Sequence, residues 1–193
     1  MESPGRHPDL GYGKPAHEHG WAERFPVLFA RSQWNWGGIT AQFGPAEPPD
    51  ALVGNVHVVA RCGARVVVCR NDLGWRFLPG GTREPDEPII ETARRELVEE
   101  AGATLLGGWR HVGAFRGELP GAGPYRPHLP HPVSYWLYAV ADVRIDGVPT
   151  NPPGGENVVE VRVLPAEVAA AWLSSYDEQT GDIVRLAAAR GLV

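Results

Sequence analysis

Three glutamates, Glu96, Glu99 and Glu100, stand three and four residues apart in one segment of the chain. On a helix these spacings place the side chains on one face, so the three carboxylates would project from neighbouring positions. The like charges of Glu96 and Glu100 cost a helix about 0.2–0.5 kcal/mol in water, and more where water is limited. A divalent cation removes that cost, and carboxylate oxygens are ligands that Mg²⁺ and Mn²⁺ select. Three glutamates alone favour the simpler interpretation of a solvated acidic face, because Glu is a good surface helix former.

The segment that carries these glutamates has the pattern of a helix. Residues 88 to 101 contain no glycine and no internal proline, and their apolar residues recur at three- and four-residue spacings. Gly102 follows as a stop signal, and Pro88 suits the first helical position, where its missing N–H is not needed. We therefore predict a helix over residues 88 to 101.

A wider motif surrounds the three glutamates. Its seven defined residues are Gly81, Glu87, Arg95, Glu96, Glu99, Glu100 and Gly102. Because each residue type has a usage of about 6–7%, a chance match of all seven is expected about once in 10⁸ windows. The segment from 81 to 103 resembles the Nudix box, and with its flanking strands the resemblance extends roughly over residues 53 to 190.

The resemblance implies an α/β fold, specifically a Nudix-type α/β/α sandwich with a mixed central sheet. It also implies hydrolysis of the diphosphate linkage in nucleoside diphosphates joined to another group X. By the same resemblance Glu96, Glu99 and Glu100 are the metal ligands, with Mg²⁺ as the cofactor or Mn²⁺ in its place. Bound cations of this kind neutralise developing charge and lower the pKa of the water that attacks phosphorus.

The other residues of the box resemble structural positions of the family. Glu87 and Arg95 are similar to the pair that holds the loop against the helix. Gly81 and Gly102 would serve backbone geometry, allowing a tight entry and a left-handed exit of the helix.

The general base stays open at this point. Within the box we prefer Glu99 or Glu96, and outside it the candidates are Glu118, Glu156 and Glu160. Glu156 follows a Pro- and Gly-rich loop just before a predicted strand, where some family members hold an extra ligand. We therefore count it with Glu99 and Glu96 as catalytic candidates.

Substrate contacts are less defined by the sequence. The guanidinium fork suits bidentate phosphate contacts, and the arginines considered for that role are Arg70, Arg76, Arg116 and Arg126. The aromatic residues considered for stacking on a base are Trp34, Trp36, Trp75, Tyr125 and Tyr135. Each is an ordinary surface or core residue in the simpler interpretation. From these sets we prefer Arg76, Arg116 and Tyr135 as the substrate-binding residues.

The remaining pattern divides the chain into an N-terminal extension, residues 1–50, and a Nudix domain, residues 51–193. Within the extension we predict an irregular arm over 1 to 20, aromatic strand-like material over 21 to 44 and a linker over 45 to 50. Within the domain we predict strands at 53–60, 65–70, 75–78, 105–116, 133–144 and 158–164, and further helices at 166–175 and 182–190.

Charge and hydropathy exclude several partners. The net charge of −5 provides no positive field for polymeric nucleic acid, so a small nucleotide-like molecule is the expected partner. No apolar run is long enough to cross a bilayer or to form a signal peptide, which favours a cytoplasmic protein without membrane contact. The aromatic segment from 21 to 44 could cover a sheet edge or associate two chains into a homodimer.

Two functions from different classes fit these observations. The first is a metal-dependent hydrolase of a small nucleoside diphosphate-X substrate. The second is a catalytically silent nucleotide-binding sensor or regulator of the same fold, and an intact ligand set does not exclude it.

Overall fold

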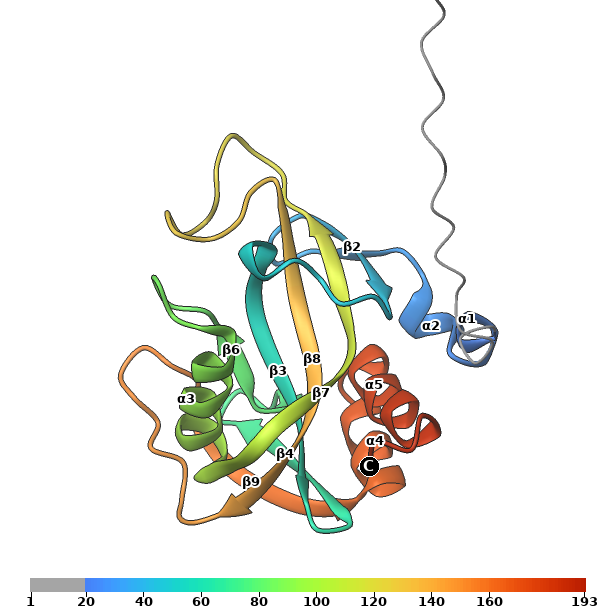
Figure 1. Cartoon of the computed structure of the whole chain (residues 1–193), viewed down its shortest axis with the longest axis vertical. Helices are drawn as coiled ribbons and strands as arrows, with labels where there is room; N and C mark the ends of the chain where they lie inside the picture. The colour runs from blue at the N-terminus through green and yellow to red at the C-terminus, as the bar shows by residue number, and fades with distance from the viewer. Residues whose placement is uncertain (1–19) are drawn as a thin grey trace, which may run out of the picture.

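The chain folds into one mixed sheet with helices on both sides, as predicted (Figure 1). The computed structural model describes residues 20–193. The arm predicted over residues 1 to 20 therefore lies, except for Gly20, outside the described residues.

Nine strands form the sheet. They are β1 (Ser32–Trp34), β2 (Ile39–Gly44), β3 (Val53–Cys62), β4 (Arg65–Asn71), β5 (Arg76–Phe77), β6 (Gly80–Thr82), β7 (Ala103–Glu118), β8 (Val133–Ile145) and β9 (Val158–Pro165). The order is β1-β2-β7-β8-β3-β4-β5, with β6 paired to β3 and β9 paired to β4. β3 and β8 run parallel, whereas the other paired strands run antiparallel, and this makes the sheet mixed.

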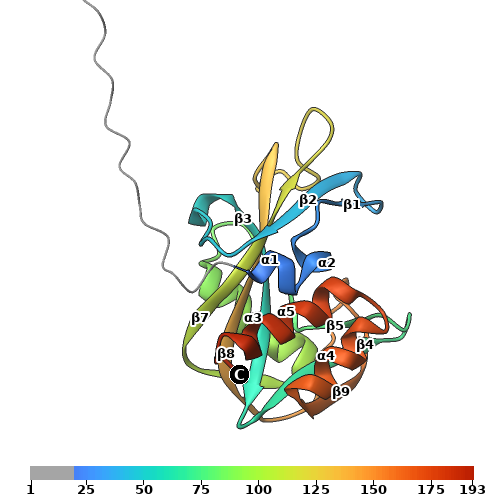
Figure 2. The ribbon, with the colours of Figure 1, turned by 90° about the vertical axis from the view of Figure 1, so that its right-hand side faces the viewer.

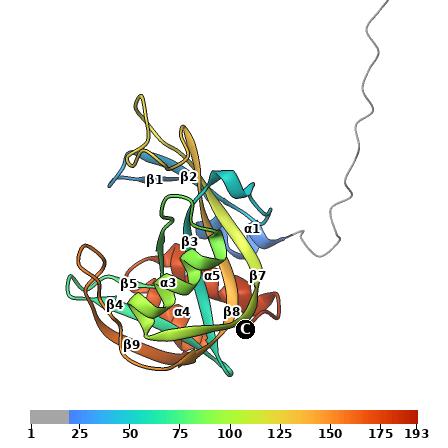
Figure 3. The same ribbon diagram turned by 60° about the vertical axis from the view of Figure 1, so that its left-hand side comes forward.

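The helices cover both faces of the sheet. They are α1 (Trp21–Arg24), α2 (Pro26–Phe29), the 3₁₀ turn η1 (Asp50–Leu52), α3 (Ile89–Ala101), α4 (Ala166–Ser174) and α5 (Glu178–Ala189). α3 packs on one face, while α4 and α5 pack on the other, and the two faces can be compared in Figures 2 and 3. No helix within residues 20–193 is long and apolar enough to span a membrane.

Alternation along the strands builds a separate core under each helical layer. On β3, Val58 and Ala60 belong to the core against α3, whereas Val59 belongs to the core against α4 and α5. The same alternation holds on β4, where Val66 faces α4 and α5 and Val67 faces α3. Successive side chains of a strand point to opposite faces, so a strand buried on both sides is apolar throughout.

The strand-like interpretation of residues 21–44 is wrong in its first part. Residues 21–29 form the short helices α1 and α2, and Pro26 opens the second of them because its fixed φ suits a first helical turn. Phe25 and Leu28 are buried in the core shared with α5. Only β1 and β2 are strands, and β2 pairs with β7, so residues 32–44 extend the central sheet.

Two helix starts also differ from the predictions. Pro88 has extended backbone, with ψ of 144°, so it precedes α3, which starts at Ile89. α5 starts at Glu178, where the Asp177 carboxylate accepts hydrogen bonds from the backbone of Gln179 and Thr180, four residues before the predicted start. Gly181 lies inside the helix where α5 approaches α4 closely, and a Cβ there would overlap a backbone carbonyl of α4.

Candidate active site

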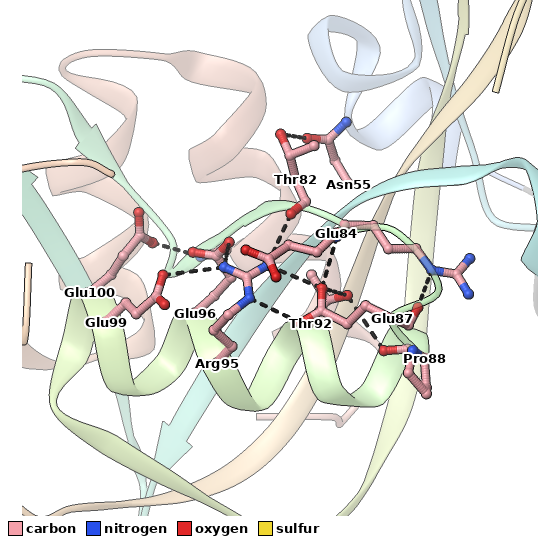
Figure 4. Close-up of polar contacts among 12 residues, drawn as sticks. Asn55, Thr82, Glu84, Glu87, Pro88, Thr92, Arg95, Glu96, Glu99 and Glu100 are labelled. Carbon is pink, nitrogen blue, oxygen red and sulfur yellow. Dashed lines mark hydrogen bonds and ion pairs between the residues drawn. The ribbon is translucent and has the colours of Figure 1, made fainter. Parts of the chain in front are cut away.

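α3, β6 and the loop before β9 enclose a hollow of about 390 Å³, which we call the acidic hollow. It is lined by residues 80–82 and 152–156, by Glu84 and Arg126, and by Arg95, Glu96, Glu99 and Glu100 of α3. Spacings of three and four residues on α3 bring the three glutamates to one side of the helix (Figure 4). The structure thus brings Glu156 to the same hollow as the glutamates of the box.

Arg95 is the centre of the hydrogen-bond network in this hollow (Figure 4). Its Nε and Nη2 donate to the two carboxylate oxygens of Glu87, over 2.9 and 3.1 Å. Its Nη1 donates to Glu96 over 2.8 Å and to Glu99 over 3.2 Å, and Nη2 also donates to the carbonyl oxygen of Thr82 over 3.0 Å. One guanidinium therefore connects the loop before α3, strand β6 and the acidic face of α3.

Glu87 is held as an anion by this network. Its burial alone would raise the pKa of the carboxyl group, but hydrogen bonds from Arg95, the backbone of Glu84 and the hydroxyl of Thr92 outweigh burial and lower the pKa. In turn, the hydrogen bond to Glu87 is the largest cause of the raised pKa of Arg95. The pair fixes the loop to the helix and leaves Glu87 no free oxygen for chemistry.

Glu96 and Glu100 are buried carboxylates, with 6% and 4% of their surface exposed. Burial raises the pKa of Glu96, and Arg95 opposes that shift only in part. Burial also raises the pKa of Glu100 well above its usual range, and the nearby charges of Glu96, Glu156 and Glu99 add to the shift against one backbone hydrogen bond from Gly80. The charged form of Glu100 is therefore disfavoured by its surroundings within the protein.

The box glycines allow the backbone to approach these side chains. A Cβ at Gly81 would overlap the carboxylate of Glu96, which Arg95 holds in place. Gly102 ends α3 at φ 59° and ψ 34°, and a Cβ there would also meet the backbone of Gly147. Both positions need glycine for this geometry.

The donor set suits a hard divalent cation, although the side chains do not converge in a ready cluster. Within the described part of the chain, no three acidic, His or Cys side chains are already arranged around one point. Glu96 and Glu99 accept hydrogen bonds from Arg95, whereas Glu100 accepts one from the backbone N–H of Gly80. Oxygen ligands with an excess of negative charge are what Mg²⁺ and Mn²⁺ select.

Comparison with known proteins agrees with this geometry. A sequence model described as the NUDIX domain matches residues 52–185. The chain belongs to the NUDIX domain family. By family it is a Nudix hydrolase, and the box identified in the sequence lies within the matched region. A search of curated proteins finds no match.

Solved structures share the fold of this Nudix hydrolase. A Bacillus subtilis pyrophosphohydrolase aligns with a TM-score of 0.52 and 19% identity, over 70% of this chain and 77% of that one. A Nudix hydrolase from Nitrosomonas europaea aligns with a TM-score of 0.50 and 14% identity, over 72% of this chain and 90% of that one. At these identities the likeness shows the fold alone. The division of the chain at residue 50 stays a prediction.

The candidates for general base are separated by the structure. Glu156 lines the acidic hollow and accepts a hydrogen bond of 2.6 Å from Asn71. Glu118 lies at the end of β7, outside this hollow, and pairs with Arg116 over 2.7 Å. Glu160 on β9 also lies outside it and pairs with Arg70 over 2.7 Å. Of the three loop and strand carboxylates, only Glu156 joins the box glutamates.

The preferred substrate-binding residues do not gather in the acidic hollow. Arg116 pairs with Glu118, and Tyr135 packs against the core under α3, so neither lines the acidic hollow. Arg126, which the sequence offered only as one of four arginines, does line it. Its position follows from the long loop between β7 and β8, which no local pattern could orient.

Arg76 lies in a second hollow of about 450 Å³, which we call the aromatic hollow. Its aromatic lining comprises Trp34, Trp36, His57, Trp75, Phe77, Phe115, Trp136, Tyr138 and Tyr176. Its other lining residues are Arg76, Gly80, Glu100, Glu156, Asp177, Gln179 and Thr180. Trp34, Trp36 and Trp75 are among the residues predicted from the sequence for stacking, whereas nothing in the sequence distinguishes Trp136, Tyr138 and His57 from core residues.

Proposed function

We propose that this Nudix hydrolase cuts the diphosphate linkage of a small nucleoside diphosphate-X substrate by water attack on phosphorus, with Mg²⁺ or Mn²⁺ as cofactor. The observation that carries the proposal is the excess of carboxylates in the acidic hollow. Five glutamates line it, Glu84, Glu96, Glu99, Glu100 and Glu156, against two arginines, Arg95 and Arg126. Arg95 also forms an ion pair with Glu87, which does not line the hollow. Much of the positive charge of Arg95 is therefore compensated by a carboxylate other than these five.

This charge balance argues for a bound cation when substrate is present. A diphosphate would add negative charge to a hollow that already holds buried carboxylates. Phosphate and carboxylates would repel each other there unless a cation compensates their charges. Glu96, Glu99 and Glu100 would hold the divalent ion. When bound, the ion supplies charge neutralisation on the phosphate oxygens and a lowered pKa of the attacking water.

Arg126 would orient the phosphate of the substrate. Unlike Arg95, it has no carboxylate partner among residues 20–193, and its side chain is exposed at the acidic hollow. A guanidinium presents a planar fork of donors that matches phosphate oxygens. We therefore assign to Arg126 the phosphate contact for which Arg76 and Arg116 were preferred from the sequence.

Glu156 is our choice for the general base. We expect Glu156→Gln to lower kcat by about 10²–10⁴-fold, because an amide cannot take a proton from the attacking water. Steady-state kinetics over a range of Mg²⁺ concentrations would measure this effect, and the Mg²⁺ concentration for half-maximal rate should stay unchanged if the residue acts on water alone. The matched control is Glu160→Gln on β9, whose carboxylate pairs with Arg70 outside the acidic hollow. A wild-type rate for Glu156→Gln would return the role to Glu99 or Glu96.

The activity itself is tested by product release from a panel of small phosphate compounds. The panel contains ADP-ribose, dinucleoside polyphosphates, nucleotide sugars and nucleoside triphosphates, each with Mg²⁺ or Mn²⁺ and with an EDTA control. We expect EDTA-sensitive cleavage of one class. Nucleotide binding without cleavage of any class would contradict the hydrolase proposal and favour the silent sensor.

Self-association and location stay proposals. Several apolar side chains of the segment 21–44, namely Phe25, Leu28, Ile39 and Phe43, are buried within the same chain, whereas Trp36 is exposed. A homodimer through this segment would therefore use its exposed surface, and light scattering of the full chain would test it. Exclusion of polymeric nucleic acid and a cytoplasmic location likewise stay predictions from the net charge and hydropathy.

A further inference from the structure

Strand β9 has one free edge, at the lower left border of the sheet in Figure 1. It pairs with β4 along one side, and no strand within residues 20–193 pairs with its other side. The side chain of Asn151 binds the backbone N–H and carbonyl oxygen of Val158, over 2.9 and 3.0 Å, and so covers only the start of the strand. Native sheets commonly keep a free edge short, because its unpaired backbone groups are a template for another strand, yet β9 has eight residues.

The sequence of β9 is complementary to itself in the antiparallel direction. Glu160 and Arg162 flank Val161, with a valine one position further out on each side. In an antiparallel pair centred on Val161, Glu160 of each copy lies opposite Arg162 of the other copy. Val159 likewise lies opposite Val163. Facing pairs of opposite charge and of β-branched side chains both stabilise antiparallel strands.

We propose that two copies of this chain associate through their β9 edges, in this register, into a two-fold symmetric dimer with one continuous sheet. This interface lies apart from the segment 21–44, which contributes no residue to β9 or to the groove beside it. The inference does not depend on the function proposed above.

The two faces of β9 keep apolar and charged side chains apart. Val161 and Val163 pack against the core under α3. On the opposite face Glu160 pairs with Arg70 over 2.7 Å and with Arg162 over 2.6 Å, and the Glu160 and Arg162 side chains stay 26% and 44% exposed. A two-fold axis perpendicular to the sheet keeps facing residues on the same side of it. Valines would therefore meet valines, and each charge would meet its opposite.

An apolar groove of about 540 Å³ lies beside β9 on the side of α3. Val148 is 80% exposed and Val159 is 52% exposed at this groove, although both are large apolar residues. Single exposed valines are ordinary, but apolar side chains gathered along a free strand edge mark a surface that another chain covers. The valines of a second β9 would lie on this same face and cover them. The groove shares no lining residue with the acidic hollow, so the dimer would leave that hollow open. The apolar residues that line the groove from β9 and from the end of β8 and its following turn are Val159, Val161, Val163, Ile145, Val148 and Pro149.

Sedimentation velocity of the full chain over a range of micromolar concentrations tests the dimer. We expect the wild type to shift from monomer to dimer as its concentration rises. Glu160→Arg places like positive charges opposite each other across the dimer, and Arg162→Glu places like negative charges there. Each single change is expected to raise the dimer Kd about tenfold or more, because symmetry repeats it at two facing pairs. The double variant with both changes restores opposite charges and should recover most of the affinity.

Val159→Lys is a second variant that leaves the Glu160–Arg70 pair within the chain intact. It replaces a half-exposed side chain and should weaken the dimer while leaving the thermal unfolding midpoint close to that of the wild type. The matched control is Val168→Lys on α4, since Val168 is 51% exposed and does not line the groove. This control should keep the wild-type Kd.

Three results would overturn the inference. The first is a wild-type chain that stays monomeric at every concentration. The second is a dimer whose Kd is unchanged by Val159→Lys and by both single charge reversals, which would place the interface elsewhere on the chain. The third is a double variant that unfolds at the wild-type midpoint but does not recover the affinity lost in the single variants.

Discussion

Glu99→Gln and Glu100→Gln are each expected to lower kcat by about 10²-fold or more at saturating Mg²⁺. The amide keeps the size of the side chain and removes its charge, so the change isolates the ligand role. A metal ion used as a Lewis acid contributes several kcal/mol to transition-state stabilisation, and about 1.4 kcal/mol corresponds to a tenfold change in rate. Steady-state kinetics with the substrate found in the panel would measure the loss, together with the Mg²⁺ concentration needed for half-maximal rate.

The control for these variants lies on the same helix. Glu91 is exposed on the first turn of α3 and pairs only with Arg94 within the described residues, so Glu91→Gln should keep the wild-type rate. Misfolding is excluded by thermal unfolding in EDTA. The midpoint of Glu100→Gln should not fall below that of the wild type, because the change removes a carboxylate whose charged form is disfavoured by burial. Full activity of both Glu99→Gln and Glu100→Gln at saturating Mg²⁺ would contradict the proposed metal site.

Arg95→Met is expected to lower the free energy of unfolding and to abolish most of the activity together. Removal of one partner from a partly buried ion-pair network should cost about 2–3 kcal/mol, below the cost for a fully buried pair because Arg95 retains some solvent contact. For a domain of this size the unfolding midpoint should then fall by about 4–12 °C. The physical reason is that Glu87 and Glu96 lose their partner together, and the loop before α3 loses its link to the helix.

Arg94→Met is the matched control for this variant. Arg94 is the preceding residue of α3, exposed to solvent, and its only ion pair within residues 20–193 is with Glu91 three positions earlier. Pairs of this kind contribute little, so the free energy of unfolding should change by no more than about 0.5 kcal/mol. Urea unfolding of both variants measures the difference. Equal stabilities of the Arg94 and Arg95 variants would show that the network around Arg95 does not hold the loop to the helix.

The box and the elements next to it could be predicted because their signals are local. The spacing of Glu96, Glu99 and Glu100 depends only on the helical period, and Gly102 ends α3 where the sequence predicts. The strands β3, β4, β8 and β9 start within a residue of their predicted positions for a similar reason, since runs of β-branched residues favour extended backbone. The mixed sheet followed from the family resemblance and is confirmed.

Short elements were mispredicted where long-range packing outweighs local preference. α1 and α2 contain aromatic residues that favour strands, yet Phe25 and Leu28 are buried against α5, which lies some 150 residues later in the chain. β6 has no β-branched pair to reveal it, and it exists because Gly80 and Gly81 pair with β3. Such elements depend on tertiary contacts for their stability rather than on propensity.

The sequence by itself determined the family, the acidic face of α3 and the residues proposed to bind metal, because one contiguous segment carries all of them. Only the tertiary structure decided which other residues share the site. It brings Glu156 and Arg126 to the acidic hollow and leaves Arg116 and Tyr135 outside it. It also joins Trp34 to Trp136, about 100 residues away, into one wall of the aromatic hollow. The order of the strands and the paths of the loops determine these contacts. The chain adopts that order and those paths because it buries two cores, one on each face of the sheet, and no spacing of residues within a single segment specifies them.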